Sequence, residues 1–239
     1  MTMGWEDIPH LSEEQKKEMY DSPPPHQRDA RSKGIPSLGA GAIYPVPETD
    51  YLVDPFEIPE HWPRVYALDV GWNRTAALWG AWDRDSDVVY LYSEHYVGQA
   101  EPVIHSQSIK ARGKWVPGVI DPAARGRAQR DGHQLLQDYI DLGLDLEIAF
   151  NGVESGIYEV WQRLSSGRLK IFKSLRNTVG EMRLYRRNDK GKIVKENDHL
   201  LDCLRYLIMS GLDRAKTKPV EKPKTNYNKY SGSSGGWMA

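Results

Sequence analysis

Three carboxylates stand where the sequence predicts that a strand ends or that a helix begins. Asp69 interrupts an apolar run, Asp121 closes the run Val116–Ile120, and Asp202 lies in the first turns of the last predicted helix. Carboxylate oxygens are hard ligands that suit Mg²⁺ or Mn²⁺. Two such ions, ~3.5–4 Å apart, hydrolyse a phosphodiester bond by activating water and stabilising the leaving oxygen. We therefore predict that Asp69, Asp121 and Asp202 form a catalytic site with two metal ions.

The start of the last predicted helix, Asp198–Leu212, gathers several polar side chains on one face. Asp198 and Asp202 are four residues apart, and His199 and Asp202 are three apart, so all three lie near the same face. Asp198 is also a suitable N-cap, and His199 could be a partly exposed residue of the first turn. Asp202 could pair with Arg205, three residues on. The spacing leaves both kinds of role open.

The elements that must position these residues follow from the periodicity of the chain. Aromatic and β-branched runs joined by short turns predict antiparallel strands at Arg64–Trp72, Thr75–Asp83 and Val88–Val97. Helices and strands then alternate: helix Glu101–Ala111, strand Trp115–Asp121, helix Ala128–Leu142, strand Leu146–Phe150, helix Ile157–Leu164, strand Leu169–Leu175 and the last helix. This order predicts an α/β fold with a mixed sheet between helices, and it resembles the ribonuclease H fold.

In a ribonuclease H-like sheet the first and fourth strands end side by side, which would bring Asp69 and Asp121 together. Each residue alone has a simpler interpretation. Asp69 could accept hydrogen bonds from the turn after its strand, and Asp121, which precedes a proline, could cap a turn or a helix. The pair is therefore more informative than either residue.

The folded domain is expected to span residues 61–213. Residues 1–60 are rich in proline and glycine and are interpreted as an extended arm with one short helix, Leu11–Tyr20. Residues 214–239 are too poor in apolar groups to offset the entropy of ordering, so a disordered basic tail is predicted there.

Composition excludes several classes of protein. The 239 residues carry a formal net charge of −1 and have a mean hydropathy of −0.64, and no apolar run is long enough to cross a membrane. The single Cys203 excludes an internal disulfide and a cysteine-based zinc site. Residues 163–195, however, hold eleven Lys or Arg against two acidic residues. Such a strip binds a polyanion if it lies on one face, and otherwise it is an ordinary solvated surface.

Beyond these patterns, residues from about 25 to 212 resemble the nuclease half of the large terminase subunit of tailed, headful-packaging bacteriophages, the motor that packages their DNA. The motifs that carry the resemblance are His26–Arg31, Gly34–Pro36, Gly41–Pro45, Ala67–Gly71, Asp121–Ala123, Val153–Ile157 and Asn197–Tyr206, of which the last is the most specific. The resemblance implies a metal-dependent endonuclease that cuts concatemeric double-stranded viral DNA in the cytoplasm of the infected bacterium.

The resemblance also assigns roles to residues. It makes Asp69 the ligand that bridges both metal ions and Asp121 the acid of the fourth strand, and on the last helix we rank Asp202 first, His199 second and Asp198 third. It implies that a hairpin at Arg183–Lys195, around the turn Asn188–Gly191, faces DNA. The expected DNA-binding residues are Arg125, Arg127, Arg183, Arg186, Arg187, Lys190 and Lys192.

One departure from the family concerns its ATPase half. No Gly-x-x-x-x-Gly-Lys-Ser/Thr loop occurs in the chain, so we expect a nuclease domain without ATPase activity. As an isolated domain, it is expected to be monomeric. The portal protein and the small terminase subunit are implied as partners of the full-length protein. Two alternatives remain: a ribonuclease H or resolvase-like nuclease with another substrate, and a portal-docking module with latent nuclease activity.

Overall fold

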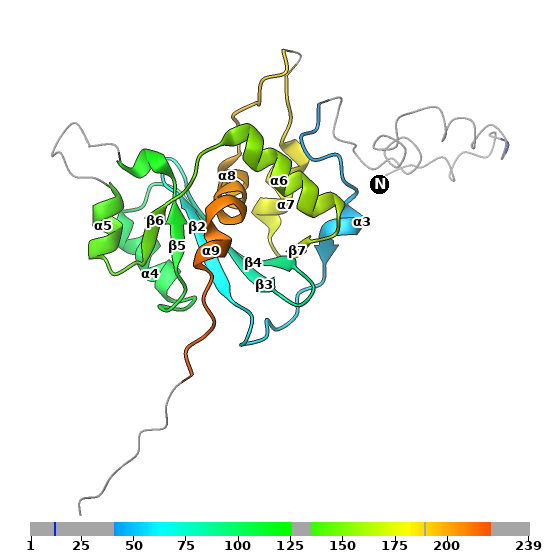
Figure 1. Ribbon diagram of the computed structural model, residues 1–239. Helices are drawn as coiled ribbons and strands as arrows, with labels where there is room; N and C mark the ends of the chain where they lie inside the picture. Colours follow the sequence, from blue (N-terminus) through cyan, green and yellow to red (C-terminus); the bar gives the residue numbers. More distant parts are fainter. Residues whose placement is uncertain (1–11, 13–40, 126–134, 189, 221–239) are drawn as a thin grey trace, which may run out of the picture.

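The computed structural model describes Ser12 and residues 41–125, 135–188 and 190–220. Seven strands form one mixed sheet in the order β1-β7-β4-β3-β2-β5-β6 (Figure 1). Their bounds are β1 Leu52–Val53, β2 Arg64–Asp69, β3 Thr75–Asp83, β4 Val88–Val97, β5 Gly118–Ile120, β6 Leu146–Ile148 and β7 Leu169–Phe172. β3 is antiparallel to both neighbours, and all other pairs are parallel. The expected mixed sheet is confirmed, with β2 beside β5.

The two faces of the sheet carry separate apolar clusters. On β2, Val65 and Ala67 belong to one cluster, and Tyr66 and Leu68 belong to the other, as the two-residue period of a strand requires. The first face is covered by α6, α7, α8 and α9, and the second by α4 and α5; Figure 1 shows α6, α8 and α9 in front of the sheet. Their bounds are α4 Pro102–Lys110, α5 Leu135–Asp141, α6 Val153–Ser165, α7 Arg176–Leu184, α8 His199–Tyr206 and α9 Leu212–Arg214.

Part of the expected arm belongs to the sheet. Residues 48–53 form α3 (Glu48–Tyr51) and β1, which pairs in parallel with β7. Tyr44 and Tyr51 are buried in the apolar cluster of the first face. Elements of four and two residues are too short to show a period in the sequence. The helix expected at Leu11–Tyr20 and the first half of the helix expected at Ala128–Leu142 lie outside the described residues, Ser12 excepted.

The sequence did not predict α7, which occupies residues 176–182, for which no element was expected, and the start of the expected hairpin at Arg183. Its first turn is satisfied by Glu94 of β4, whose carboxylate accepts hydrogen bonds from the amides of Asn177 (3.0 Å) and Thr178 (2.9 Å). Because this capping group lies 84 residues from Thr178 in sequence, no local sequence motif predicts the helix.

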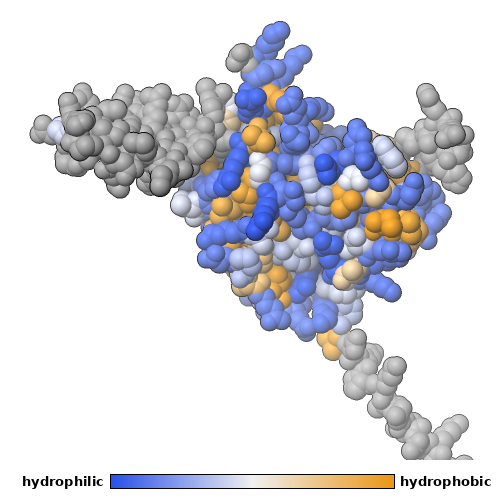
Figure 2. Space-filling model, turned by 180° about the vertical axis from the view of Figure 1, so that it is seen from behind, coloured by the Kyte–Doolittle hydropathy of each residue, from blue (hydrophilic) through white to orange (hydrophobic). Residues whose placement is uncertain are grey.

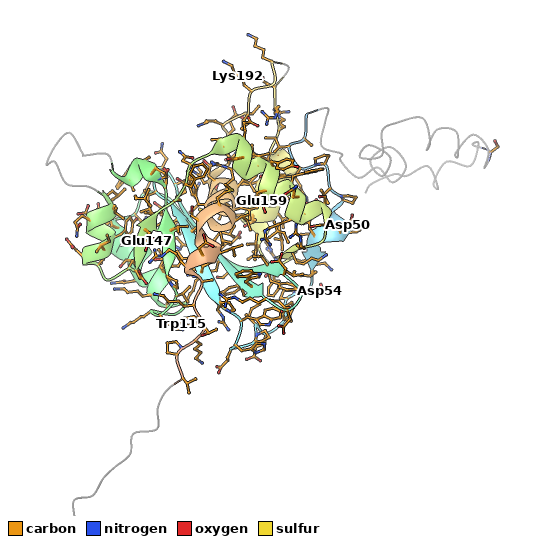
Figure 3. All side chains as sticks on the ribbon, viewed as in Figure 1. Asp50, Asp54, Trp115, Glu147, Glu159 and Lys192 are labelled. Atoms are coloured by element: carbon orange, nitrogen blue, oxygen red, sulfur yellow. The ribbon has the colours of Figure 1, made fainter. Side chains whose placement is uncertain are left out.

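The auxiliary hairpin is present but shorter than expected, because Arg183 lies in α7. It begins at Arg186, whose carbonyl accepts a hydrogen bond from the amide of Val194 (3.0 Å), and Arg187 bridges Ile193. Lys192 lies near its tip and points away from the rest of the molecule (Figure 3).

The opposite end of the sheet, where β2, β5 and β6 begin, is closed by the chain that follows α9. Lys216 and Arg64 exchange two backbone hydrogen bonds (2.7 and 3.2 Å). Arg214 donates to the carbonyl of Gly118, and both Arg214 and Lys216 pair with Asp145 (2.5 and 2.9 Å). We call these five residues the amino edge. Residues 214–216, which we had assigned to the tail, thus pack on the domain.

The described surface is mostly hydrophilic when seen from behind, with apolar side chains gathered in small patches (Figure 2). In the part of the chain that the structure describes, every helix is too short or too polar to cross a lipid bilayer.

Candidate metal centre

The carboxyl-terminal ends of β2 and β5 lie side by side. Leu68 pairs with Ile120, and the amide of Asp121 donates to the carbonyl of Leu68 over 2.9 Å. Asp69 and Asp121 therefore leave neighbouring strands at one end of the sheet, as expected. Asp121 Oδ1 also accepts a hydrogen bond from the amide of Ala123 (3.1 Å), so this residue caps the following turn as well.

α8 brings the third group of candidate ligands to the same end. Leu200, Leu204 and Cys203 are fully buried against the sheet, and the Cys203 thiol donates to the carbonyl of Ala76 on β3 (3.3 Å). This packing fixes the direction of the helix and places the His199 ring beside β2. His199 Nδ1 lies 2.7 Å from Asp69 Oδ2 and donates a hydrogen bond to it.

The other two predicted catalytic carboxylates also have partners on α8. The hydroxyl of Tyr206 donates to Asp121 Oδ1 over 3.1 Å. Arg205 Nη2 donates to Asp202 Oδ1 over 2.6 Å, and the arginine is only 2% exposed. The ion pair between Asp202 and Arg205 confirms the structural role considered for Asp202. It does not remove the carboxylate from the site, because Asp202 influences Asp69 electrostatically.

We define the carboxylate edge as Asp69, Asp121, Asp198, His199 and Asp202. Burial raises the pKa of Asp69, the charges of Asp121 and Asp202 raise it further, and the hydrogen bond from His199 opposes both effects. Burial and the charge of Asp202 raise the pKa of Asp198. Like charges therefore gather at this edge in a partly dehydrated place, which is the electrostatic condition that a bound cation relieves.

His199 is the basic member of the carboxylate edge. Its hydrogen bond to Asp69 raises the pKa of the imidazole against the effect of burial, and the charges of Glu181 and Asp198 act in the same direction. The side chain is 38% exposed, so the residue is both a first-turn residue with access to solvent and a direct partner of Asp69.

Glu181 of α7 supports the site, and the sequence analysis missed it. Its Oε2 accepts hydrogen bonds from the amides of Leu200 (2.7 Å) and Leu201 (3.2 Å) at the start of α8. Asp198 occupies the N-cap position but makes no capping hydrogen bond with its side chain. A residue of another helix thus performs the expected role of Asp198. Burial raises the pKa of Glu181 to about 7. In the sequence, Glu181 is one of two acidic residues in the basic stretch 163–195, and nothing in that pattern predicts a contact with the start of the last helix.

The donor set at the carboxylate edge fits a hard divalent cation, because it consists of carboxylate oxygens and one imidazole. Within the described ranges, however, no three His, Cys, Asp or Glu side chains converge as a group that could hold a metal ion. Each of the three carboxylates instead contacts a side chain of the protein: Asp69 contacts His199, Asp121 contacts Tyr206 and Asp202 contacts Arg205. Metal binding would require these side chains to exchange protein partners for the ion.

Two of the expected DNA-binding residues are held by carboxylates of the domain itself. Arg183 donates two hydrogen bonds to Glu48 (2.5 and 2.8 Å), and Arg187 donates two to Glu154 (3.0 and 2.6 Å). These forked pairs connect α7 to α3 and the hairpin to α6. They give Arg183 and Arg187 a structural role that the sequence did not suggest.

The remaining basic residues divide into two groups. Lys190 and Lys192 are both exposed at the turn of the hairpin, and Arg186 is bridged through its backbone to Ala42. Arg127 and the side chain of Arg125 lie outside what the structure describes. The hairpin ends a few residues before Asp198, so its lysines are attached to the carboxylate edge by a short stretch of chain.

Comparison with known proteins gives one consistent result. The family described as the terminase RNase H-like domain matches residues 67–210. The large terminase subunit of Salmonella phage P22 is 35% identical over 228 residues, which cover 91% of this chain and 45% of that protein. The chain therefore spans about half the length of this relative.

Solved structures agree with the family match. The P22 large terminase nuclease domain superposes with a TM-score of 0.68 at 33% identity, covering 76% of this chain and 97% of that one. The large terminase nuclease domain of bacteriophage SPP1, solved with bound Mn, shares the fold at a TM-score of 0.51 and 16% identity, covering 67% of this chain and 96% of that one. The seven-stranded sheet and the match over residues 67–210 show that this chain belongs to the terminase RNase H-like domain family.

Proposed function

We propose that this chain is a metal-dependent endonuclease that cuts concatemeric double-stranded viral DNA during genome packaging. The observation that carries the proposal is the gathering of Asp69, Asp121 and Asp202 at the ends of two strands and a helix, where their charges act on one another. The relationship to the P22 nuclease domain supports the reaction class. Cleavage of the DNA backbone needs a site of this kind, because the attacking and leaving oxygens both carry developing negative charge.

Asp69, Asp121 and Asp202 would hold two Mg²⁺ or Mn²⁺ ions, with His199 and Asp198 as further ligands. When bound, the ions supply a water of lowered pKa and stabilise the leaving oxygen. The SPP1 nuclease domain with bound Mn supports a divalent metal. Asp69 would exchange its hydrogen bond with His199 for the metal, which is chemically reasonable because burial and like charges oppose its ionisation.

The surrounding residues orient the carboxylates. Arg205 holds Asp202 from its buried side, and the Tyr206 hydroxyl fixes one oxygen of Asp121. Glu181 holds the first turn of α8, so that His199 and Asp202 keep their places relative to β2. Lys190 and Lys192 would bind phosphates of the DNA that extends beyond the cut.

The partners and the location follow from the proposed role. Double-stranded DNA is the substrate, and the portal protein and small terminase subunit would be partners of the whole protein. The reaction would take place in the cytoplasm of the infected bacterium.

The test is incubation of supercoiled plasmid with the purified chain and Mn²⁺ or Mg²⁺, with EDTA and the Asp69→Asn variant as controls. Nicking and linearisation that need both the metal and Asp69 are expected. An RNA–DNA hybrid of the same sequence is assayed in parallel. Preferential cleavage of the hybrid would replace the packaging substrate with a ribonuclease H-type substrate, and no cleavage of any substrate by a folded sample would contradict the proposal.

A further inference from the structure

Trp72 is a large aromatic residue that follows Asp69 closely in the chain and is not buried in either apolar cluster. Trp72 is 64% exposed, although tryptophan is a residue that proteins mostly bury. It stands three residues after Asp69, in the loop between β2 and β3. A single exposed aromatic side chain is ordinary on a protein surface, so what distinguishes Trp72 is its place in the chain, directly after the strand that ends at Asp69.

The loop that carries Trp72 is fixed by contacts on both sides. The amide of Gln99 donates to the carbonyl of Trp72 over 2.8 Å, and the Thr75 hydroxyl donates to the carbonyl of Gly71 over 3.0 Å. Gly98 lies so close to Asn73 that a Cβ atom there would approach the Asn73 carbonyl oxygen to 2.1 Å. The backbone of Trp72 is therefore held in place by the segment Gly98–Gln99 on one side and by Thr75 on the other.

The groups around this loop are suited to a polyanion with flat apolar rings. The Arg74 guanidinium stacks on the ring of Tyr96, 4.5 Å from its centroid, and Tyr96 in turn lies 6.4 Å from the His199 ring. Among the residues that the structure describes, Arg74 forms no ion pair with a carboxylate. A cation held by an aromatic face keeps its charge available for a phosphate.

We propose that Trp72 is a DNA-contacting residue of this site, whose indole ring inserts against the base step next to the phosphate at the carboxylate edge, while Arg74 binds a neighbouring phosphate. The inference rests on the proposed nuclease function and adds a determinant of where the DNA is cut. An apolar wedge unstacks a base step at some energetic cost, so flexible steps such as TA accept it most readily. The chain should therefore cut preferentially beside flexible or mismatched steps.

The experiment compares Trp72→Ala, Trp72→Phe and, as a matched control, Trp161→Ala. Trp161 is another exposed tryptophan, on α6 and 38% exposed. Cleavage of a short duplex with a central TA step is measured in Mn²⁺. Trp72→Ala is expected to raise KM about tenfold, since stacking of an aromatic ring on a base contributes roughly 5–150-fold to binding. Trp72→Phe should recover most of that loss, and Trp161→Ala should match the unsubstituted chain.

A second measurement reads the contact directly and does not need cleavage. A duplex that carries 2-aminopurine at the TA step is titrated with the Asp69→Asn variant and with the double variant Asp69→Asn, Trp72→Ala. Unstacking by the ring should raise the emission for the first protein and not for the second. If the emission is the same for both, or if Trp72→Ala keeps the KM and step preference of the unsubstituted chain, the proposal for Trp72 is overturned while the nuclease function stands. If the unsubstituted chain does not cleave, the nuclease function fails, and the 2-aminopurine signal still decides whether Trp72 contacts DNA.

Discussion

The two ends of the parallel strands use the same residue types in opposite ways. At the amino edge, Asp145 faces Arg214 and Lys216, and although burial acts against them, hydrogen bonds from Lys216 and Arg214 lower the pKa of Asp145. At the carboxylate edge, Asp69 is buried near Asp121 and Asp202, and its pKa is raised. Paired opposite charges close one end of the sheet, whereas like charges are gathered at the other. Like charges gathered against their own repulsion are typical of functional sites, and paired charges are typical of structural contacts.

The largest expected effect comes from replacing one acid at each edge. Asp69→Asn should lower metal-dependent cleavage by roughly 10²–10³-fold or more without lowering the free energy of unfolding, because the amide removes a carboxylate that burial disfavours. Asp145→Asn should leave cleavage unchanged and lower the free energy of unfolding by about 0.5–1 kcal/mol. Plasmid cleavage and urea unfolding at pH 7 measure both. If Asp145→Asn lost cleavage and Asp69→Asn kept it, the functional site would lie at the amino edge and not at the carboxylate edge.

Asp202 is the exception at the carboxylate edge, because it is paired with the opposite charge of Arg205. Its removal should therefore lower both cleavage and the free energy of unfolding. Asp202→Ala leaves the buried Arg205 guanidinium without its partner and should lower the free energy of unfolding by about 3 kcal/mol, besides abolishing cleavage. The double variant Asp202→Ala, Arg205→Met should recover much of the stability and none of the cleavage. Equal stabilities of the single and double variants would mean that the pair contributes little to folding.

Glu181 should change the pH dependence of stability. Burial raises the pKa of Glu181 to about 7 in the folded protein, whereas in the unfolded chain this carboxyl group has its ordinary pKa of 4.5. The free energy of unfolding therefore falls as the pH rises between these values. The Glu181→Gln side chain can still accept the hydrogen bonds from the amides of α8 but does not titrate. Between pH 5 and pH 7.5 its free energy of unfolding should therefore fall by about 2 kcal/mol less than that of the unsubstituted chain.

Glu48→Gln provides the control of opposite sign for that experiment. The hydrogen bond from Arg183 lowers the pKa of Glu48, so its contribution is present at neutral pH and is lost as the pH falls through its folded value. Urea unfolding at pH 5 and pH 7.5 tests Glu181→Gln, and urea unfolding at pH 5 and at a pH below 4.5 tests Glu48→Gln, because the contribution of Glu48 is lost only there. If Glu181→Gln follows the unsubstituted chain at both pH 5 and pH 7.5, the carboxyl group of Glu181 does not titrate in that interval.

The smallest effect is expected at the hairpin. Lys190→Gln with Lys192→Gln should reduce the slope of log Kd against log salt by about 2, because each lost phosphate contact lowers it by about 1. Arg183→Gln should not change the slope, since Glu48 already neutralises that arginine. Fluorescence polarisation of a labelled duplex at several salt concentrations measures the difference. If Arg183→Gln changed this slope more than the lysine variant does, the DNA would contact α7 and not the hairpin turn.

Regular periodicity predicted the parts of the molecule that depend on local pattern. The strands β2, β3 and β4 and the helix α8 follow from apolar spacing, and the adjacency of Asp69 and Asp121 follows from their order. The contacts that could not be predicted join residues far apart in the chain. Glu94 and Glu181 cap helices in place of local residues. Likewise, the forked pairs of Arg183 with Glu48 and of Arg187 with Glu154 could not be predicted, because a charge pattern does not reveal which acid folds against it.

The backbone bridge between Arg64 and Lys216 sets the direction in which the chain leaves the domain. Arg64 begins β2 and Asp69 ends it, so the chain after Lys216 starts from the end of the sheet remote from Asp69. Figure 1 shows the chain after α9 leading away from the sheet, and Val220 is 90% exposed. A bead, dye or surface tether attached just after Val220 would thus leave the carboxylate edge facing the solution. This attachment point would allow single-molecule measurements of the proposed cleavage of stretched DNA, because the tether would not block the carboxylate edge.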